Sequence, residues 1–176
     1  MTILTTILYV FAALVALVLL VALLKKKTYD VTCEVVINTS KQNVFGYLKQ
    51  LKNQDNFNIW VMADPTAKKE FKGEDGTTGF VYAWNGNKKA GEGEQEIKKL
   101  IENELIATEI RFIRPFKAVA YADYKLESVS ENQTKVIWNN KSTMKYPMNV
   151  MISMIEKMLA KDMNTSLLNL KNILEK

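Results

Sequence analysis

The residues of this chain that could do chemistry are carboxylates and tyrosines, because its 176 residues include no histidine and only one cysteine. Histidine is the usual general base and a common metal ligand, and zinc sites draw mainly on histidine and cysteine. The sequence also has no phosphate-binding loop, no dinucleotide-binding glycine motif and no nucleophile elbow. It therefore predicts neither a metal nor a cofactor.

The densest group of carboxylates is Glu92, Glu94 and Glu96, which alternate with Gly93, Gln95 and Ile97. In a strand, alternate side chains point to one face, so the three glutamates share the face opposite Ile97. We interpret that face as solvent-exposed, with ion pairs to lysines on neighbouring strands, and not as a general acid/base pair. The glycines indicate a bend of the strand or a close approach of another group to its backbone.

Other reactive types are scattered. Cys33 lies in the middle of a predicted strand among apolar neighbours, which predicts a buried, inert thiol. No spacing singles out Tyr82, Asp123 or Arg111 as a catalytic group. An enzyme that uses a buried carboxylate or a tyrosine therefore stays open as an alternative.

The elements that must position these residues begin with a hydrophobic segment, Ile3 to Leu24, which contains no charge and is followed at once by Lys25-Lys26-Lys27. A helix needs about 20 apolar residues to cross a bilayer core. A cleaved signal peptide is the alternative, but the segment is long for one, lacks a preceding basic region and lacks a typical cleavage site. We expect residues 1–27 to be a transmembrane anchor with a basic flank.

The three lysines also predict the orientation of this anchor. Basic flanks tend to stay cytoplasmic, which places the N-terminus outside and the rest of the chain in the cytosol. The lone cysteine agrees with a reducing compartment, and four N-x-S/T triplets are expected to be chance matches. The expected location is the cytoplasmic membrane, crossed once, with Lys25, Lys26 and Lys27 at anionic headgroups of the lipid bilayer.

Residues 28–176 have the size of one domain. The whole chain has a formal charge of +5, but three of its positive charges are the flanking lysines, which leaves 21 basic and 19 acidic residues in this domain. Nucleic-acid binding needs a concentrated basic surface, and the sequence indicates none. We therefore expect no nucleic-acid partner.

The domain has an α+β pattern. Apolar residues alternate from Asp30 to Asn38, which predicts a strand, and an amphipathic helix follows from Lys41 to Leu51. A short helical or irregular stretch, Asp55 to Ala63, precedes five or six strands that start at Lys68. The later strands are expected at 80–84, 89–101, 105–112, 118–129 and 135–144, with a hairpin turn at Asn85-Gly86-Asn87.

The last segment changes to a helical period. From Pro147 to Glu175 there is no further glycine or proline, and apolar residues recur every three or four positions. This predicts one long amphipathic helix, whose apolar stripe packs across one face of an antiparallel sheet.

This order of elements resembles the helix-grip fold of the START-like superfamily, in particular its polyketide cyclase/dehydrase-like (SRPBCC) branch. The resemblance covers residues 30–175 and rests on a set of matching stretches: Lys41–Leu51, Trp60 with Asp64-Pro65, Gly79 to Asn87, Gly91 to Ile97, Phe112 with Pro115-Phe116, Trp138, and Leu167 to Lys171. It implies a curved sheet of about six to seven strands that grips the long helix, with two short helices at one side.

The resemblance also implies a cavity between sheet and helix for a hydrophobic or amphipathic small molecule. Five methionines in the first half of the last helix and aromatic residues on the strands suit an adaptable apolar wall, although plain core packing explains such residues as well. The expected ligand-binding residues are Trp60, Phe80, Tyr82, Trp84, Phe112, Tyr124, Trp138, Met151, Met154, Ile155 and Met158.

Three functions fit these observations. The favoured one is a membrane-tethered, noncatalytic binder of a lipid-like or polyketide-like molecule. The fold implies a cavity for such a molecule, and the anchor would keep that cavity beside the bilayer into which the molecule partitions. The second is a cyclase- or dehydratase-type enzyme with a buried carboxylate or tyrosine. The third is a partner-binding module whose cavity is filled by its own side chains.

Overall fold

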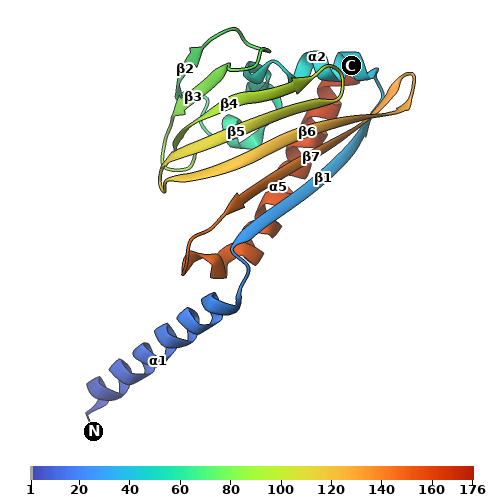
Figure 1. Cartoon of the computed structure of the whole chain (residues 1–176). Helices are drawn as coiled ribbons and strands as arrows, with labels where there is room; N and C mark the ends of the chain where they lie inside the picture. The colour runs from blue at the N-terminus through green and yellow to red at the C-terminus, as the bar shows by residue number, and fades with distance from the viewer. Residues whose placement is uncertain (1) are drawn as a thin grey trace.

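An antiparallel sheet of seven strands curves over one long helix in the computed structural model, which describes residues 2–176 (Figure 1). The strand order is β1-β7-β6-β5-β4-β3-β2, so the first strand pairs with the last. The strands are β1 (Thr28–Ile37), β2 (Lys68–Lys72), β3 (Val81–Asn85), β4 (Glu92–Ile101), β5 (Leu105–Arg114), β6 (Ala118–Ser130) and β7 (Gln133–Thr143).

The helices lie at three places in the chain. They are α1 (Ile3–Leu24), then α2 (Lys41–Leu48), η1 (Leu51–Asn53), α3 (Gln54–Phe57) and α4 (Ile59–Met62) after β1, and η2 (Met148–Met151) and α5 (Ile152–Leu174) after β7. The predicted α+β helix-grip architecture is thereby confirmed, with one apolar N-terminal helix. Within residues 2–176, α1 alone is long and apolar enough to cross a membrane, a property that signal sequences share.

The main core lies between the sheet and the second half of α5. Met163, Leu167 and Leu170 are fully buried there, against strand residues such as Val136 and Ile106. Alternation of buried and exposed positions along β6 and β7 supplies the apolar inner surface of the sheet. In the first half of α5, only Ile152 is fully buried between residues 152 and 162. The helix therefore packs closely on the sheet at one end only.

Several element boundaries differ from the predicted ones, and two of the differences are at the 86–91 loop and at the start of the long helix. The strand predicted from Lys89 begins at Glu92, because the Asn87 side-chain oxygen accepts hydrogen bonds from the backbone nitrogens of Lys89 (2.8 Å) and Ala90 (3.1 Å). The predicted tight hairpin is thus a wider loop, residues 86–91. The long helix begins at Ile152 and not at Pro147, and the 3₁₀ turn η2 fills the interval.

Residues of η2 and the segment before it join the domain to α1. The fully buried Asn149 donates its side-chain N–H groups to the backbone oxygens of Ala22 (2.7 Å) and Lys25 (3.1 Å). Ala22 is buried by this contact, and Lys26 forms a 2.6 Å ion pair with Glu156 of α5. The last carbonyls of a helix have no partners within it, so Asn149 satisfies groups that would otherwise be buried without one.

The Asn149 contact predicts the strength of this junction. Removal of one partner from a buried hydrogen bond costs about 1–3 kcal/mol. We expect Asn149→Ala to accelerate trypsin cleavage after residues 25–27 about tenfold in the detergent-solubilised full chain, since local opening exposes those lysines. Asn164→Ala is the control, because Asn164 bonds only within the exposed face of α5. Equal cleavage rates in the two variants would contradict the role assigned to Asn149.

Candidate functional site

A cavity of about 270 Å³ lies where α5 and the sheet diverge, between α4 and the inner surface of strands β2 to β5. Its lining is mainly apolar and comes from most elements of the domain. The lining residues are Tyr29, Gln54, Asn58, Trp60, Val61, Ala63, Ala67, Lys69, Tyr82, Trp84, Lys89, Ala90, Gln95, Ile110, Phe112, Asn140 and Leu159. A partly enclosed, mainly apolar cavity with a few polar groups is typical of small-molecule sites, and this one is small for its class.

Aromatic side chains form two opposing walls. Trp84 of β3 and Phe112 of β5 meet edge to face, with ring centroids 6.2 Å apart, across Gly93 of the intervening strand β4. Trp60 of α4 meets the buried Trp138 edge to face at 5.7 Å, and its ring nitrogen donates a 3.0 Å hydrogen bond to Asp162 of α5. These contacts fix both indoles, so the walls are held in place by packing and by hydrogen bonds.

Gly93 explains how Trp84 reaches its position. A Cβ at residue 93 would lie 2.7 Å from the Trp84 ring and 2.7 Å from the Arg111 carbonyl oxygen. The indole therefore occupies the space that a side chain at residue 93 would fill. Its ring nitrogen also donates a 3.0 Å hydrogen bond to the Ala90 carbonyl, which ties the 86–91 loop to the cavity wall. Both interpretations of this glycine apply, because the pairing of β4 with β5 also shifts in register between Glu92 and Gly93.

The floor of the cavity is a chain of buried hydrogen bonds. Asn58 donates to Gln54 (3.1 Å), and Gln54 donates to Gln95 (3.0 Å). Gln95 donates in turn to the Thr108 hydroxyl (2.9 Å), which donates to the Ala122 carbonyl (2.7 Å). These four side chains are buried, and each link satisfies a donor that would be costly to leave unpaired. The floor is polar but internally paired.

Tyr82 is a lining residue whose hydroxyl is paired with a carboxylate. Its hydroxyl donates a 2.6 Å hydrogen bond to Asp55, whose other carboxylate oxygen lies 2.7 Å from the ammonium group of Lys69. Burial, and then the bond to Asp55, raise the pKa of the Tyr82 phenol far above its usual range. The phenol stays protonated and its proton is already donated to Asp55, so Tyr82 is poorly placed to act as a general acid or base.

Asn140 supplies the least satisfied polar atom of the lining. Its side-chain oxygen is buried and has no hydrogen-bond partner among residues 2–176. A buried acceptor without a donor is costly, so this atom is the natural contact for a hydroxyl or amine of a bound molecule.

The mouth of the cavity is formed by two loops that Asp64 holds together. Its carboxylate accepts a 2.7 Å hydrogen bond from the Thr66 hydroxyl in its own loop and another of 2.7 Å from the backbone nitrogen of Asn87 in the 86–91 loop. The first of these bonds, together with the second, lowers the pKa of Asp64, so the carboxylate is ionised at neutral pH. Lys89 and Ala90 of the bonded loop line the mouth.

The other candidate chemical groups lie outside the cavity. Arg111 points to the outer surface of the sheet, where it pairs with Glu94 and Glu96, while Glu92 pairs with Arg114. The glutamate row is therefore an ion-pair ladder, with arginines as its main partners. Burial of the Cys33 thiol raises its pKa, and residues 2–176 contain no cluster of three potential ligands that could hold a metal.

The structure brings four of the eleven predicted ligand-binding residues to the cavity, namely Trp60, Tyr82, Trp84 and Phe112. Phe80 packs in the core with Leu51 and Ile97, and Tyr124 and Trp138 form a stacked pair in the main core, 5.0 Å between centroids. Met151 and Ile155 are half-buried away from the lining.

Met154 and Met158 differ most from the expected arrangement, because they are 58% and 53% exposed on the outer side of α5. The helix turns its Leu159 side toward the cavity instead. Sequence analysis missed the polar lining of Gln54, Asn58, Gln95 and Asn140. The signal for Gln95 was present, since it shares a strand face with Gly93 and the buried Ile97.

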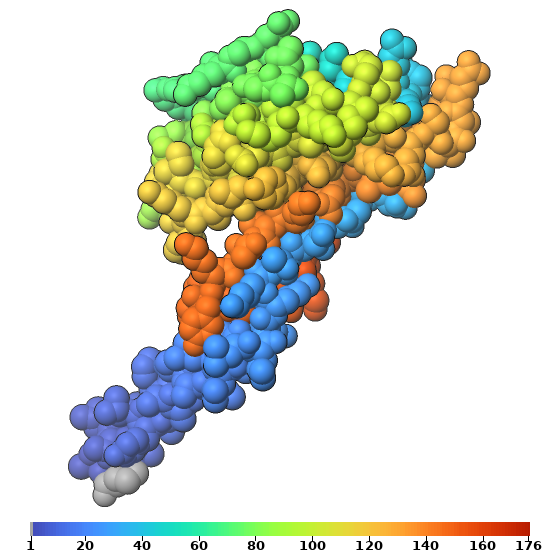
Figure 2. Space-filling model, viewed as in Figure 1, coloured from blue at the N-terminus to red at the C-terminus, as the bar shows by residue number. Residues whose placement is uncertain are grey.

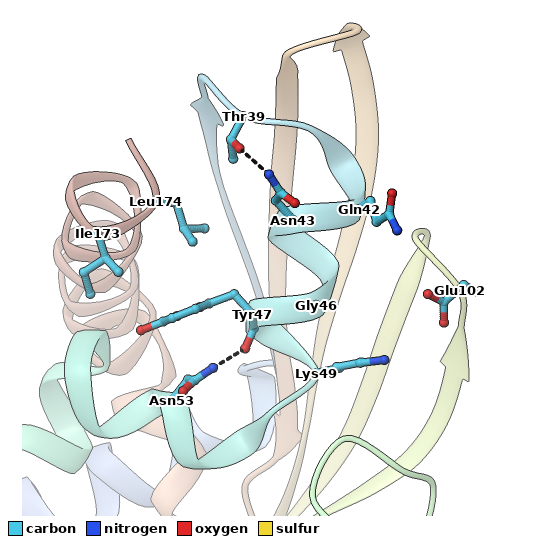
Figure 3. A pocket seen from close by; sticks show the side chains of 10 residues that line it. All are labelled: Thr39, Gln42, Asn43, Gly46, Tyr47, Lys49, Asn53, Glu102, Ile173 and Leu174. Atoms are coloured by element: carbon cyan, nitrogen blue, oxygen red, sulfur yellow. Dashed lines mark hydrogen bonds between the residues drawn. The ribbon is translucent and has the colours of Figure 1, made fainter. Parts of the chain in front are cut away.

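A second, larger depression of about 690 Å³ lies around α2, at the opposite end of the domain (Figure 3). Figure 3 shows Tyr47, Ile173 and Leu174 on one side of α2, and Gln42 and Lys49 pointing to the other. It is wide open, and polar side chains make up most of its lining. A site of this shape encloses little of a small molecule, so we regard the partly enclosed cavity as the candidate site.

Known structures share this fold. Norcoclaurine synthase from Thalictrum flavum, solved in complex with dopamine and hydroxybenzaldehyde, is 10% identical over 87% of this chain and 90% of its own, with a TM-score of 0.63. The Aha1 dimer from Colwellia psychrerythraea is 19% identical over 84% and 96%, with a TM-score of 0.56. Ara h 8.0201 is 13% identical over 84% and 97%, with a TM-score of 0.59.

These likenesses show that the chain has the helix-grip fold. They go no further at such low identity, because one fold hosts many functions. The sequence matches no family model and no curated protein.

The contact between Gly93 and Trp84 gives a stability prediction. Gly93→Ala forces a methyl group against the indole and a backbone carbonyl, and such overpacking costs about 1–3 kcal/mol. Gly46→Ala is the matched control, because a Cβ at this position in α2 meets nothing within 4 Å and should stabilise the helix by about 0.5–1 kcal/mol. Denaturant unfolding of the detergent-solubilised full chain, followed by tryptophan fluorescence, measures both. A Gly93→Ala variant as stable as the parent would show that Trp84 is free to move.

Proposed function

We propose that this protein is a membrane-tethered, noncatalytic binder of a hydrophobic or amphipathic small molecule. The ligand occupies the cavity between the sheet, α4 and α5, and α1 holds that cavity beside the bilayer from which such a molecule partitions. A cavity of about 270 Å³ suits a small lipid-like or polyketide-like molecule, or one end of a longer one that extends through the mouth.

The observation that carries this proposal is the composition of the cavity lining. Its walls are aromatic and aliphatic, its polar floor is paired with itself, and no Asp or Glu of the described chain lines it. Asp123, one of the residues considered for catalysis, has a raised pKa through burial, but it neighbours the outward-facing Lys141 and does not line the cavity. A cyclase- or dehydratase-type mechanism needs a carboxylate or phenol free to move a proton, and Tyr82 is engaged with Asp55.

The tether rests on α1 and its flank. The helix is exposed along nearly all of its 22 residues, which is costly in water and favourable in lipid. Lys25, Lys26 and Lys27 follow it directly, and a basic flank favours retention on the cytoplasmic side. The proposed topology is therefore a single span with the N-terminus outside and the domain in the cytosol.

Filling the cavity tests the binding proposal. Ile110 lines it from β5, and Ile110→Trp places an indole in the ligand volume. We expect native mass spectrometry of the full chain, extracted from host membranes in mild detergent, to show a bound small molecule that this variant has lost. Met154→Trp is the control, because Met154 faces solvent and the variant should keep the ligand.

The alternatives give different results in the same measurement. A parent protein that is free of ligand, and stays so after incubation with membrane lipid extract, would overturn the binding proposal. It would favour a partner-binding module or an enzyme with a transient substrate. Loss of the ligand from Met154→Trp alone would place the site at the helix methionines.

Labelling in intact cells tests the topology. Val129 is exposed at the end of β6 far from α1, and Val129→Cys offers a thiol there, while the native Cys33 is buried. We expect a membrane-impermeant maleimide to label Val129→Cys only after lysis, because the domain faces the cytosol. Labelling of intact cells would reverse the proposed orientation.

A further inference from the structure

Four loops lie at the end of the domain from which α1 leaves. Strand pairing brings the loops that follow β3, β5 and β7 and the loop that precedes β2 to the same end of the sheet. The pairs that show this are Thr28 with Thr143, Phe112 with Ala118, Glu92 with Arg114, and Lys68 with Asn85. We call these four loops the proximal loops: residues 63–67, 86–91, 115–117 and 144–147. Figure 1 shows them on the side of the domain from which α1 leaves.

The loops that adjoin the strands differ in charge between the two ends of the sheet, while the α2 segment carries Lys41 and Lys49 at the far end. The proximal loops contain Lys88, Lys89, Lys117 and Lys145 and one acidic residue, Asp64, which is buried and hydrogen-bonded. The loops at the other end, 38–40, 73–80, 102–104 and 131–132, contain no basic residue, and their acidic residues are Glu74, Asp75, Glu102, Glu104 and Glu131.

The four proximal lysines are free to meet another surface. All four are exposed, and none of them forms an ion pair within residues 2–176. With Lys25–Lys27 beside them, they make this end of the domain basic. The concentration of charge escaped sequence analysis because the lysines come from separate loops.

Exposed aromatic residues lie among these lysines. Phe116, at the tip of the β5–β6 hairpin between Pro115 and Lys117, is 73% exposed, the most exposed aromatic side chain of the described chain. Tyr146 follows Lys145 in the next proximal loop and is 42% exposed. Basic residues mixed with exposed aromatic ones are typical of surfaces that contact the headgroup layer of an anionic bilayer.

Contacts with α1 set the height of this end relative to the bilayer. The Tyr146 hydroxyl lies 3.4 Å from the Leu19 carbonyl oxygen, inside the apolar helix and not beyond its end. The Asn149 side chain donates hydrogen bonds to the carbonyl oxygens of Ala22 and Lys25, and the backbone nitrogen of Met144 donates a 2.7 Å hydrogen bond to the Lys27 carbonyl. In Figure 2 the orange segment after β7 accordingly lies against the blue end of α1. A bilayer crossed by α1 therefore meets the proximal loops.

We infer that the proximal loops form a second membrane-contact surface, which docks on anionic headgroups of the bilayer that α1 crosses and turns the cavity mouth toward them. Lys88, Lys89, Lys117 and Lys145 contact the phosphates, and Phe116 and Tyr146 enter the interface. The mouth lies within this surface, since Ala67, Lys89, Ala90 and Phe112 line the cavity from the proximal end. This inference rests on the proposed tether and on the proposed role of the cavity.

A fluorescent label at Phe116 tests the docking in the full chain. Phe116→Cys, labelled with an environment-sensitive fluorophore, is reconstituted in vesicles of phosphatidylcholine with phosphatidylglycerol that contain a lipid-borne quencher. Val129→Cys, labelled in the same way, is the matched control from the far end of the sheet. The parent chain reports any background from the buried Cys33.

We expect severalfold stronger quenching at position 116 than at position 129. The additional changes Lys88→Glu, Lys89→Glu and Lys117→Glu should reduce the signal at 116 to that of the control, as should vesicles of phosphatidylcholine alone, because both remove the charge attraction. Equal quenching at 116 and 129 in anionic vesicles would overturn the inference. So would a lysine-reversed variant that still folds, judged by its circular dichroism, and is quenched like the parent.

Ligand retention in the same preparations separates this inference from the proposed function. A retained ligand with no quenching at position 116 overturns the docking surface and leaves the binding function standing. Strong quenching in a protein that never holds a ligand supports the docking surface and overturns the binding function.

Discussion

The divergence of α5 from the sheet is the constraint on which the site depends. A straight helix laid across a curved sheet touches it closely over only part of its length. Here the close contact is made by Met163, Leu167 and Leu170 in the second half of α5. In the first half of α5, Leu159 is the residue that lines the cavity. The short helices α3 and α4, with Asn58 between them, then close the gap from the side and supply Gln54 and Trp60. The cavity is therefore a product of the architecture, and its chemistry is decided by the few residues that surround the gap.

Those residues divide the interior into an apolar space and a satisfied polar floor. Close packing would ordinarily eliminate such a space, because voids forfeit contacts. Rigid walls keep it open: Trp84 is held by Gly93 and Ala90, and Trp60 by Asp162. The buried oxygen of Asn140 adds one polar position that a ligand can meet. The arrangement favours binding selected by shape, with one directional contact, over proton transfer.

The sequence predicted the architecture well because its signals are local. Alternation in β1, the period of α5 and the uncharged length of α1 each follow from near neighbours, and all three elements were found. The site was predicted less well because it depends on which side of an element faces the gap. Tyr82 and Trp84 were placed by strand alternation, whereas Met154 and Met158 lie on the solvent side of a helix whose rotation the pattern left open. The contact of Asn149 with α1 and the clustering of lysines from separate loops depend on tertiary structure, so no local pattern in the sequence indicated them.

The pairing of the first strand with the last bears on how the domain folds. Thr28 finds its partner in Thr143, so β1 has no neighbour in the sheet until almost the whole chain has been synthesised. Such distant pairings slow folding and leave an unpaired strand available to other chains in the meantime. β1 starts a few residues after α1, and a span inserted early would hold it at the membrane surface during this interval. An α1 inserted in a membrane would then limit where the exposed strand can meet another nascent chain, and thereby reduce misassembly while β1 is unpaired.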